Sequence, residues 1–407
     1  MQLEDLQSAY FTSLMSLTRP TAPDGILYRL ASRGDAYFDK QQYKEAITFY
    51  SKALIKTKTD AEAPGARDFI ALIFANRSAA YFYIGCLVDS AKDAEVVVRL
   101  KPDWSKGYFR LAEAFYGLRR FKEAVDAYQK SIALDPTSIE ARTSLLKSKY
   151  LAEDTEKGMM IIQLSPGKDI AIPNSYNPIQ NKIYEYAIEM RNFVYIIADV
   201  VSRLCVVVDA CWDAHGIMEV IKREKLHCIG AIVTHYHFDH VGGTPPSPFN
   251  QLPIKVTGLA TIIKKWPNVR AYIHQEDIRY VRESNPEIDP SRIIPTTHDF
   301  ELKLGTESKI RFLHTPGHTP GSQCLLVNES RLFSGDTLFL GTCGRLDLPG
   351  ACKLDMFQSL QKVLKDLDDN TMVYPGHNYG GEWTTIAQEK AHGVLRGISR
   401  EKWLATR

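Results

Sequence analysis

A cluster of metal-type side chains in the second half of the chain constrains its fold more than any other stretch. Three histidines, His235, His237 and His240, lie with Asp239 within six consecutive positions. The apolar segment 229–233 precedes them, and its short β-branched run is typical of a buried strand. Neutral imidazole nitrogen and ionised carboxylate oxygen are ligands that zinc and iron take in proteins. We therefore predict a metal site at the end of a strand.

The histidines are unevenly distributed along the 407 residues. All eleven lie between His215 and His392, so we expect the chemistry in the second half of the chain. A length above what one hydrophobic core usually covers predicts two domains. The seven cysteines are scattered and include no Cys-x-x-Cys pair, which argues against a disulfide framework or a thiolate zinc site.

The charge balance excludes several classes of partner. Lys plus Arg is 50 and Asp plus Glu is 48, and the net charge of +2 is too small to indicate binding to nucleic acid or to a membrane surface.

The first residues lack the basic start and apolar run of a secretory signal, and no stretch is long and apolar enough to span a bilayer. We predict a cytoplasmic protein.

A pattern of small and aromatic residues recurs in the first half of the chain. The second and third copies are 34 residues apart, and the first stands 44 residues before the second. This pattern resembles the tetratricopeptide repeat, in which two antiparallel helices pack closely within each unit. Four positions keep the offsets 0, 3, 12 and 16 in each copy: Gly34, Tyr37, Ala46 and Tyr50; Ser78, Tyr81, Ser90 and Ala94; Ala112, Phe115, Ala124 and Tyr128.

The resemblance implies an all-α helical-repeat solenoid over residues 27–156. The longer first spacing implies an insertion near residues 59–68. A solvating cap helix is expected to follow the last unit, because such stacks need a polar end. The predicted organisation is a leader of unknown role (1–26), three repeat units (27–60, 71–104 and 105–138), a cap helix (Ile139–Glu156) and a second domain (159–407).

Stacked helix pairs of this kind usually form a concave groove that binds peptide segments. Some members of the repeat family hold the C-terminal carboxylate of heat-shock chaperones with a clamp of Lys, Asn and Arg side chains. Asn76, Lys106 and Arg110 match three of the five clamp positions, whereas Ala31 and Asp35 depart from the other two. Losing one ammonium and gaining one carboxylate weakens anion binding. A chaperone tail is one expected ligand, and a scaffold or oligomerisation role is the alternative.

Three later stretches also place a metal-type side chain at the end of a predicted strand. A lone histidine or aspartate there more often hydrogen-bonds locally, but four such stretches in order point to one shared site. Tight turns rich in proline and glycine hold two of the three side chains. The side chains are His318 in Pro316–Ser322, Asp336 after Arg331–Gly335, and His377 after Met372–Pro375.

The ordered set His-x-His-x-Asp-His, Gly-His-Thr-Pro-Gly-Ser, Gly-Asp-Thr and Pro-Gly-His resembles the signature of the metallo-β-lactamase superfamily over residues 159–392. That resemblance implies an αββα sandwich with the site at the sheet edges. Asp209 is then either a partner that orients a ligand histidine or a simple strand-end turn. The implied ligands are His235, His237 and His318 for one metal, Asp239, His240 and His377 for a second, and Asp336 as the bridge.

Within the superfamily, the chain resembles the glyoxalase II and persulfide dioxygenase branch most. The stretch Cys343–Asp347 resembles the Gly-Arg-x-Asp of persulfide dioxygenases and short bacterial glyoxalases. By this resemblance Arg345 and Tyr379 are candidate substrate-binding residues. Arg345 either grips a substrate carboxylate or pairs with Asp347, and Tyr379 is either a contact to glutathione or a core aromatic.

Two chemistries fit these residues. In the first, two zinc ions supply a hydroxide that attacks a thioester such as an acylglutathione, with Asp239 and His240 as the predicted catalytic residues. In the second, His235, His318 and Asp336 hold one Fe²⁺ that serves a persulfide dioxygenase. We favour the hydrolase. A third hypothesis makes the repeat domain the functional part and the enzyme-like half an inactive adaptor.

Overall fold

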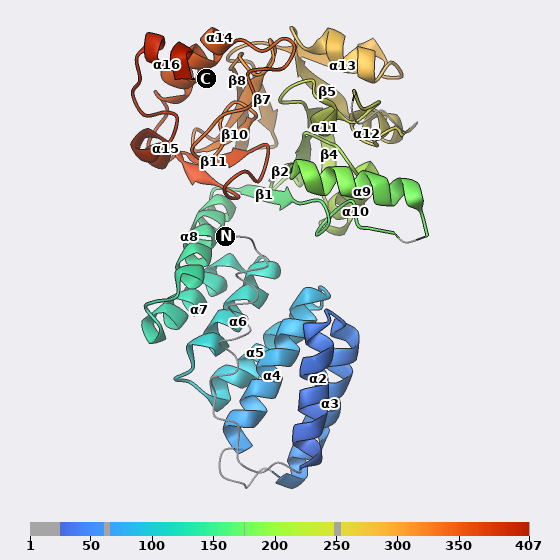
Figure 1. The fold of residues 1–407 in the computed structure, drawn as a ribbon, viewed down its shortest axis with the longest axis vertical. Coiled ribbons are helices and arrows are strands. Elements are labelled where there is room, and N and C mark those ends of the chain that lie inside the picture. The colour runs from blue at the N-terminus through green and yellow to red at the C-terminus, as the bar shows by residue number, and fades with distance from the viewer. Residues whose placement is uncertain (1–24, 61–65, 175, 248–253, 407) are drawn as a thin grey trace. The chain divides into compact units, whose positions relative to one another are not determined.

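The computed structural model describes residues 25–60, 66–174, 176–247 and 254–406 (Figure 1). The predicted leader therefore lies outside the described residues except for its last two positions, and so do residues 61–65 of the predicted insertion. The chain divides between Glu153 and Asp154 into two compact units, each described below by itself.

The first unit consists of antiparallel helices that follow one another in pairs (Figure 1). Helices α2 and α3, α4 and α5, and α6 and α7 pack as hairpins, as the predicted repeat requires. The helix predicted as a cap follows the third pair. The helices are α2 (Ile26–Asp39), α3 (Tyr43–Asp60), α4 (Ala66–Tyr83), α5 (Leu87–Leu100), α6 (Ser105–Gly117), α7 (Phe121–Leu134) and α8 (Ile139–Glu156).

The recurring small residues lie where the two helices of a pair come closest. A Cβ at Gly34 would lie 2.5 Å from the Tyr50 ring, so only glycine fits opposite this tyrosine. In the second pair, the hydroxyls of Ser78 and Ser90 lie 3.1 Å apart, and each donates to the other residue's carbonyl at 2.9 Å. Ala112 is fully buried at the matching place in the third pair. The sequence period thus reflects the contacts that close each hairpin.

The second unit contains two six-stranded sheets. Their strand orders are β1-β2-β3-β4-β5-β6 and β12-β11-β10-β9-β8-β7, with β3 to β6 mutually parallel and β10 parallel to β11. The first sheet comprises β1 (Met159–Leu164), β2 (Val194–Asp199), β3 (Leu204–Val208), β4 (His227–Ile232), β5 (Arg270–His274) and β6 (Ile293–Thr296). The second comprises β7 (Glu301–Leu304), β8 (Ser308–His314), β9 (Gln323–Val327), β10 (Arg331–Gly335), β11 (Met372–Pro375) and β12 (Thr384–Thr385).

Helices cover the outer face of each sheet (Figure 1). Between the sheets, Tyr195 contacts Phe333 with ring centroids 5.0 Å apart, and Tyr272 contacts Phe312 at 6.2 Å. This arrangement confirms the predicted αββα sandwich. The helices are α9 (Pro178–Met190), α10 (Ala214–Arg223), α11 (Phe238–Val241), α12 (Leu259–Lys265), α13 (Ile278–Ser284), α14 (Lys353–Gln358), α15 (Ile386–His392) and α16 (Arg400–Thr406), with the 3₁₀ turn η2 (Pro290–Arg292) and the π-helical turn η3 (Ser359–Leu364).

The direction of the strands determines where the site forms. Strands β8, β10 and β11 run the same way, because β9 is antiparallel to both β8 and β10. Their carboxyl ends therefore meet at one edge of the second sheet, and the segment after β4 meets them there, since Gln323 N–H donates to the Thr234 carbonyl. The four predicted metal-type stretches all begin at this edge.

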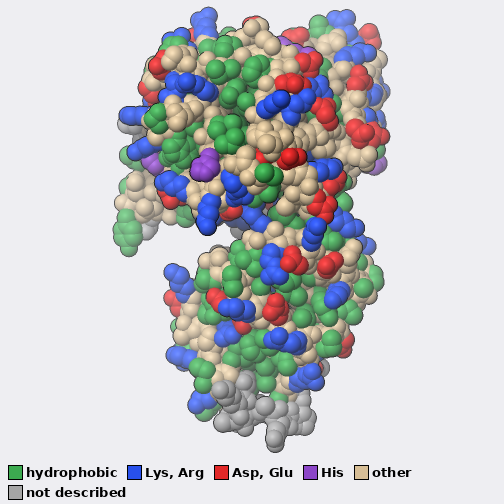
Figure 2. Space-filling view, turned by 180° about the vertical axis from the view of Figure 1, so that it is seen from behind, with side chains coloured by type: hydrophobic (Ala, Val, Ile, Leu, Met, Phe, Trp, Pro, Cys, Tyr) green, Lys and Arg blue, Asp and Glu red, His purple; other side chains and the backbone are tan. Residues whose placement is uncertain are grey.

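The surface carries both signs of charge. On the face drawn in Figure 2, lysine and arginine side chains are interspersed with aspartate and glutamate side chains, in keeping with the net charge of +2. No helix within the described ranges is both long and apolar enough to cross a membrane.

Candidate metal centre

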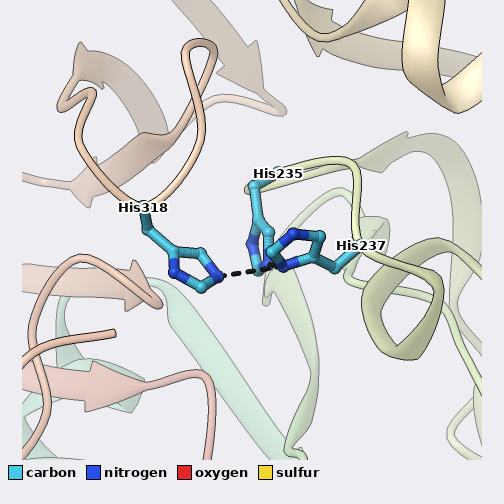
Figure 3. Close-up of side chains that lie close together, drawn as sticks. All are labelled: His235, His237 and His318. Atoms are coloured by element: carbon cyan, nitrogen blue, oxygen red, sulfur yellow. Dashed lines mark hydrogen bonds between the residues drawn. The ribbon is translucent and has the colours of Figure 1, made fainter. Parts of the chain in front are cut away.

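Three histidines converge at the edge of the sandwich (Figure 3). His235 and His237 follow β4, and His318 comes from the loop after β8 in the other sheet. The Nδ1 atom of His237 lies 3.1 Å from Nε2 of His235 and 2.9 Å from Nε2 of His318. Three ring nitrogens this close together, pointing toward one another, form a donor set for a cation.

A second triad lies beside the first. Asp239 and His240 are on the short helix α11, and His377 follows β11. The Nε2 atoms of His240 and His377 are 3.1 Å apart, and each lies 3.5 Å from Oδ2 of Asp239. All three side chains are buried, so the triad is shielded from bulk water.

Asp336 lies between the two triads, directly after β10. Its Oδ2 is 3.4 Å from Nε2 of His318 and 3.3 Å from Nε2 of His377, and its Oδ1 is 3.4 Å from Nε2 of His240. Within the described residues, the buried Oδ1 accepts no hydrogen bond. A buried carboxylate oxygen without a donor is costly, and a cation shared by both triads would compensate it.

In His318 and His377, the hydrogen bond made by Nδ1 fixes the direction in which Nε2 points. Nδ1 of His318 lies 2.8 Å from the Arg345 carbonyl, and Nδ1 of His377 lies 2.6 Å from the Met190 carbonyl. A carbonyl only accepts, so each Nδ1 carries a proton, and in the neutral ring Nε2 presents its lone pair to the centre. This tautomer is the one that a metal ligand requires, so the residues present fit a divalent ion.

Glycines allow the loops to approach the donors. A Cβ at Gly376 would lie 2.6 Å from Oδ1 of Asp336, and one at Gly344 would lie 2.3 Å from the Asp336 carbonyl. Gly335, at the end of β10, has φ +48°, a conformation that disfavours side chains. The motif glycines thus leave room for the ligands instead of merely marking turns.

Burial and charge divide the histidines into two groups. Burial lowers the pKa of His235 well below its usual value and that of His237 to about 4, so both are neutral at pH 7. Burial also acts to lower the pKa of His240, but Asp239, Asp336 and Asp209 outweigh it and raise the pKa to about 10. A metal ion that binds here would displace this proton.

Asp209 supports the second triad from behind, at the end of β3. Its Oδ2 lies 2.9 Å from Nδ1 of His240, and its carboxylate accepts from the Thr234 N–H at 2.8 Å and the Thr234 hydroxyl at 2.7 Å. It also adopts φ +54°. Of the two roles expected for Asp209, the structure therefore favours orientation of a ligand histidine.

Three further residues near the centre were not identified from the sequence: Asn192, Trp212 and Asp277. Asn192 donates to Oδ2 of Asp239 at 3.0 Å, and its own Oδ1 accepts from the Trp212 indole N–H at 3.1 Å. The buried Asp277 accepts from the Tyr236 and Gly321 backbone N–H groups. No motif marks these residues, and their common signal, a buried polar side chain, exists only in the folded chain.

The two candidate substrate residues lie at the rim. The Arg345 guanidinium pairs with Asp347 at 2.7 Å, and both side chains are about two-thirds exposed. Of the two roles expected for Arg345, the ion pair with Asp347 is the one in the structure. The Tyr379 ring stacks on His377 with centroids 4.7 Å apart and planes at 10°, and 40% of the residue is exposed. Tyr379 is therefore a surface aromatic beside the centre.

Two of the three predicted clamp residues contact carboxylates of the repeat domain. Asn76 donates to Oδ1 of Asp35 at 3.0 Å, and Arg110 pairs with Glu113 at 2.6 Å. Burial, followed by the charge of Arg110, lowers the pKa of Lys106. The structure thus brings Lys106 and Arg110 together on α6, whereas Asn76 binds the carboxylate that departs from the clamp pattern.

Comparisons with known families agree with the two-part organisation. The profile of the Metallo-beta-lactamase superfamily matches residues 190–377. Profiles of the Tetratricopeptide repeat match residues 29–54 and 105–138, the second of which has the same limits as the third predicted unit.

Curated relatives match the second half of the chain. The probable polyketide biosynthesis zinc-dependent hydrolase PksB of Bacillus subtilis is 30% identical over 189 residues, which are 46% of this chain and 74% of the relative. The mouse mitochondrial persulfide dioxygenase ETHE1 is 27% identical over 218 residues, 52% of this chain and 74% of the relative. A chicken hydroxyacylglutathione hydrolase-like protein is 30% identical over 192 residues, 46% and 57% of the two chains. On this evidence the chain belongs to the metallo-β-lactamase superfamily and carries tetratricopeptide repeats ahead of that domain.

Proposed function

We propose that this protein is a metal-dependent hydrolase of the glyoxalase II type, which cleaves a thioester such as an acylglutathione. The observation that carries the proposal is the pair of complete donor triads with Asp336 between them. A binuclear hydrolase would use both triads, whereas the mononuclear alternative would use only His235, His318 and Asp336.

The seven donors fit two zinc ions. His235, His237 and His318 would hold one ion, Asp239, His240 and His377 the other, and Asp336 would contact both. When bound, two such ions lower the pKa of a shared water and polarise the carbonyl that it attacks. The protein supplies the fixed lone pairs, and the Asp336 carboxylate offsets the repulsion between the ions.

Elemental analysis combined with a thiol-release assay tests this proposal. We expect about two zinc equivalents per chain and hydrolysis of S-acylglutathione by the purified protein. H318A and D336A are each expected to lose turnover by at least about 100-fold, because each removes a donor from the reacting centre. Full activity in either variant would count against the assignment, and a wild-type chain without bound metal or turnover would favour the adaptor hypothesis.

A persulfide dioxygenase with one Fe²⁺ is the second candidate. The Arg345–Asp347 pair supports it, because Gly-Arg-x-Asp resembles that branch and the arginine and aspartate are side by side in the fold. Oxygen uptake and sulfite formation from glutathione persulfide by the iron-loaded protein distinguish the two. We expect neither if the hydrolase proposal is correct.

For the repeat domain, we propose peptide binding in its groove, with a chaperone tail as the test case. Asp35, which accepts from Asn76, would place a like charge near a C-terminal carboxylate and weaken its binding. Fluorescence anisotropy with a tail peptide and its amidated form measures this directly. We expect the two peptides to bind with equal, weak affinity. A large preference for the peptide with the free carboxylate would instead support binding by the carboxylate clamp.

A further inference from the structure

Arg191 has a fixed backbone position at the rim of the metal centre. It ends helix α9 in a left-handed conformation (φ 58°, ψ 32°), and its N–H donates to the Ala187 carbonyl. Its own carbonyl accepts from Asn378 N–H at 2.9 Å, one residue after the ligand His377. The next residue, Asn192, contacts Asp239. The Arg191 backbone is therefore held between Asn192, which contacts the second triad, and Asn378, which follows His377 in sequence.

Arg345 holds the corresponding place beside the first triad. Its carbonyl accepts from Nδ1 of His318 at 2.8 Å, and at the second triad the matching contact to Nδ1 of His377 comes from the carbonyl of Met190, the residue before Arg191. Its guanidinium, however, is engaged by Asp347 through Nε at 3.0 Å and Nη2 at 2.7 Å. The charge of Arg345 is thus neutralised within its own loop.

The charge of Arg191 is not neutralised in this way. Over the described parts of the chain, no carboxylate lies within ion-pair distance of the exposed Arg191 guanidinium. Burial raises the pKa of Tyr379 to about 12, Asp336 and Asp239 act in the same direction, and Arg191 and Arg345 oppose it. The two backbone positions at the rim therefore carry one compensated guanidinium, Arg345, and one uncompensated guanidinium, Arg191.

We propose that Arg191 binds a carboxylate on the thiol-bearing part of the substrate, so that the enzyme selects anionic over neutral thioesters. This inference rests on the proposed hydrolase function. A guanidinium donates two parallel hydrogen bonds to a carboxylate, and a fixed backbone reduces the entropy lost in binding. The Tyr379 ring, which stacks on His377, provides a flat apolar surface at the same rim.

Two thioesters that differ by one carboxylate test the proposal. S-acyl-N-acetylcysteine carries it, and S-acyl-N-acetylcysteamine lacks it. The readout is the ratio of kcat/KM for the anionic substrate to that for the neutral one. We expect R191A to lower this ratio by roughly tenfold, since a hydrogen-bonded charge contact is lost. R191K should lower it less, because it keeps the charge but not the fork.

R400A is the matched control, because Arg400 is an exposed arginine on α16, an element that carries none of the metal donors. It should leave the ratio unchanged. A ratio in R191A equal to that of the wild type, or a loss of the same size in R400A, would overturn the role of Arg191. Circular dichroism of each variant excludes misfolding as the cause.

A binding experiment separates this inference from the proposed function. If the wild type hydrolyses neither thioester, the hydrolase proposal fails. Calorimetry of the metal-loaded protein with N-acetylcysteine and N-acetylcysteamine still tests Arg191, since both thiols can reach the metal and only one bears a carboxylate. The inference is supported if the wild type binds N-acetylcysteine more tightly than N-acetylcysteamine and R191A does not. It is contradicted if the ratio of the two affinities is the same in the wild type and in R191A.

Discussion

At the scale of single residues, Asp336 links the two triads through both of its oxygens. Because it stands between them, its loss affects both metal sites, unlike the loss of any one histidine. The N–H of Gly344 donates to the Asp336 carbonyl at 2.8 Å, so the loop after β10 is fixed together with the ligand. We therefore expect the charge of this one side chain to affect metal binding at both triads.

We expect D336N to weaken zinc binding by at least about 100-fold, because the amide keeps the shape of the side chain but loses the negative charge shared by the ions. Calorimetric titration of the metal-free protein measures the loss. D347N is the matched control, since Asp347 is exposed and pairs only with Arg345 among the described residues. A D336N protein that still takes up two zinc ions with wild-type affinity would contradict the bridging role.

Asp209 permits a second residue-scale prediction. D209A removes the acceptor of His240 Nδ1 and should weaken the metal site formed by the second triad by about 10- to 100-fold. D213A is the control, because Asp213 caps α10 by accepting from Gly216 N–H, so its loss affects stability by about 1 kcal/mol. Competition with a zinc chelator measures the affinity. A similar loss of affinity in D213A would show that stability, not orientation of His240, is responsible.

At the scale of elements, Asp277 joins the two loops that carry the first triad. It precedes α13, accepts from Tyr236 N–H in the loop after β4, and accepts from Thr319 and Gly321 in the loop after β8. The loops belong to different sheets, so this buried carboxyl group connects the two layers next to the ligands. It links the loops that carry His237 and His318.

Asp277 also predicts how stability depends on pH. Burial raises its pKa from 3.8 to about 6, so its contribution to stability is complete below pH 4 and is lost as the pH rises through 6. The stability advantage of the wild type over D277N should therefore shrink by up to about 3 kcal/mol between pH 4 and pH 7. Urea unfolding of both proteins measures this difference, in which the titration of other groups cancels. A difference that grows with pH would contradict the assigned shift.

Several elements and the fold class were predictable from sequence. The segment 159–164 is a strand with the expected limits, because its apolar run is bounded by turn residues. The convergence of the seven candidate donors was predictable because each lies within a few residues of a strand end. Asn192 was not, since its contact with Asp239 spans 47 residues and depends on the order of strands in the first sheet. Local patterns identify donors, whereas long-range topology determines their partners.

At the scale of the whole molecule, the two units should respond differently to metal removal. All seven candidate donors lie in the second unit, so we expect a bound metal ion to stabilise that unit against unfolding. At a free zinc concentration 100 times Kd, the stabilisation is about 2.7 kcal/mol. We expect a chelator to lower the melting temperature of one calorimetric transition and leave a second transition, assigned to the repeats, in place. A single transition that shifts as one would show that the units unfold together.

The strand order has a consequence for biosynthesis. A polypeptide emerges from the ribosome from its N-terminus, and His377, which completes the second triad, comes after β11, the second-to-last strand of the described chain. Four of the donors are synthesised much earlier, before the second sheet that carries the other donors exists. They are His235, His237, Asp239 and His240. Metal binding by all seven candidate donors would thus be a late event in synthesis, and a chain truncated before His377 would lack one donor even if its first sheet had folded.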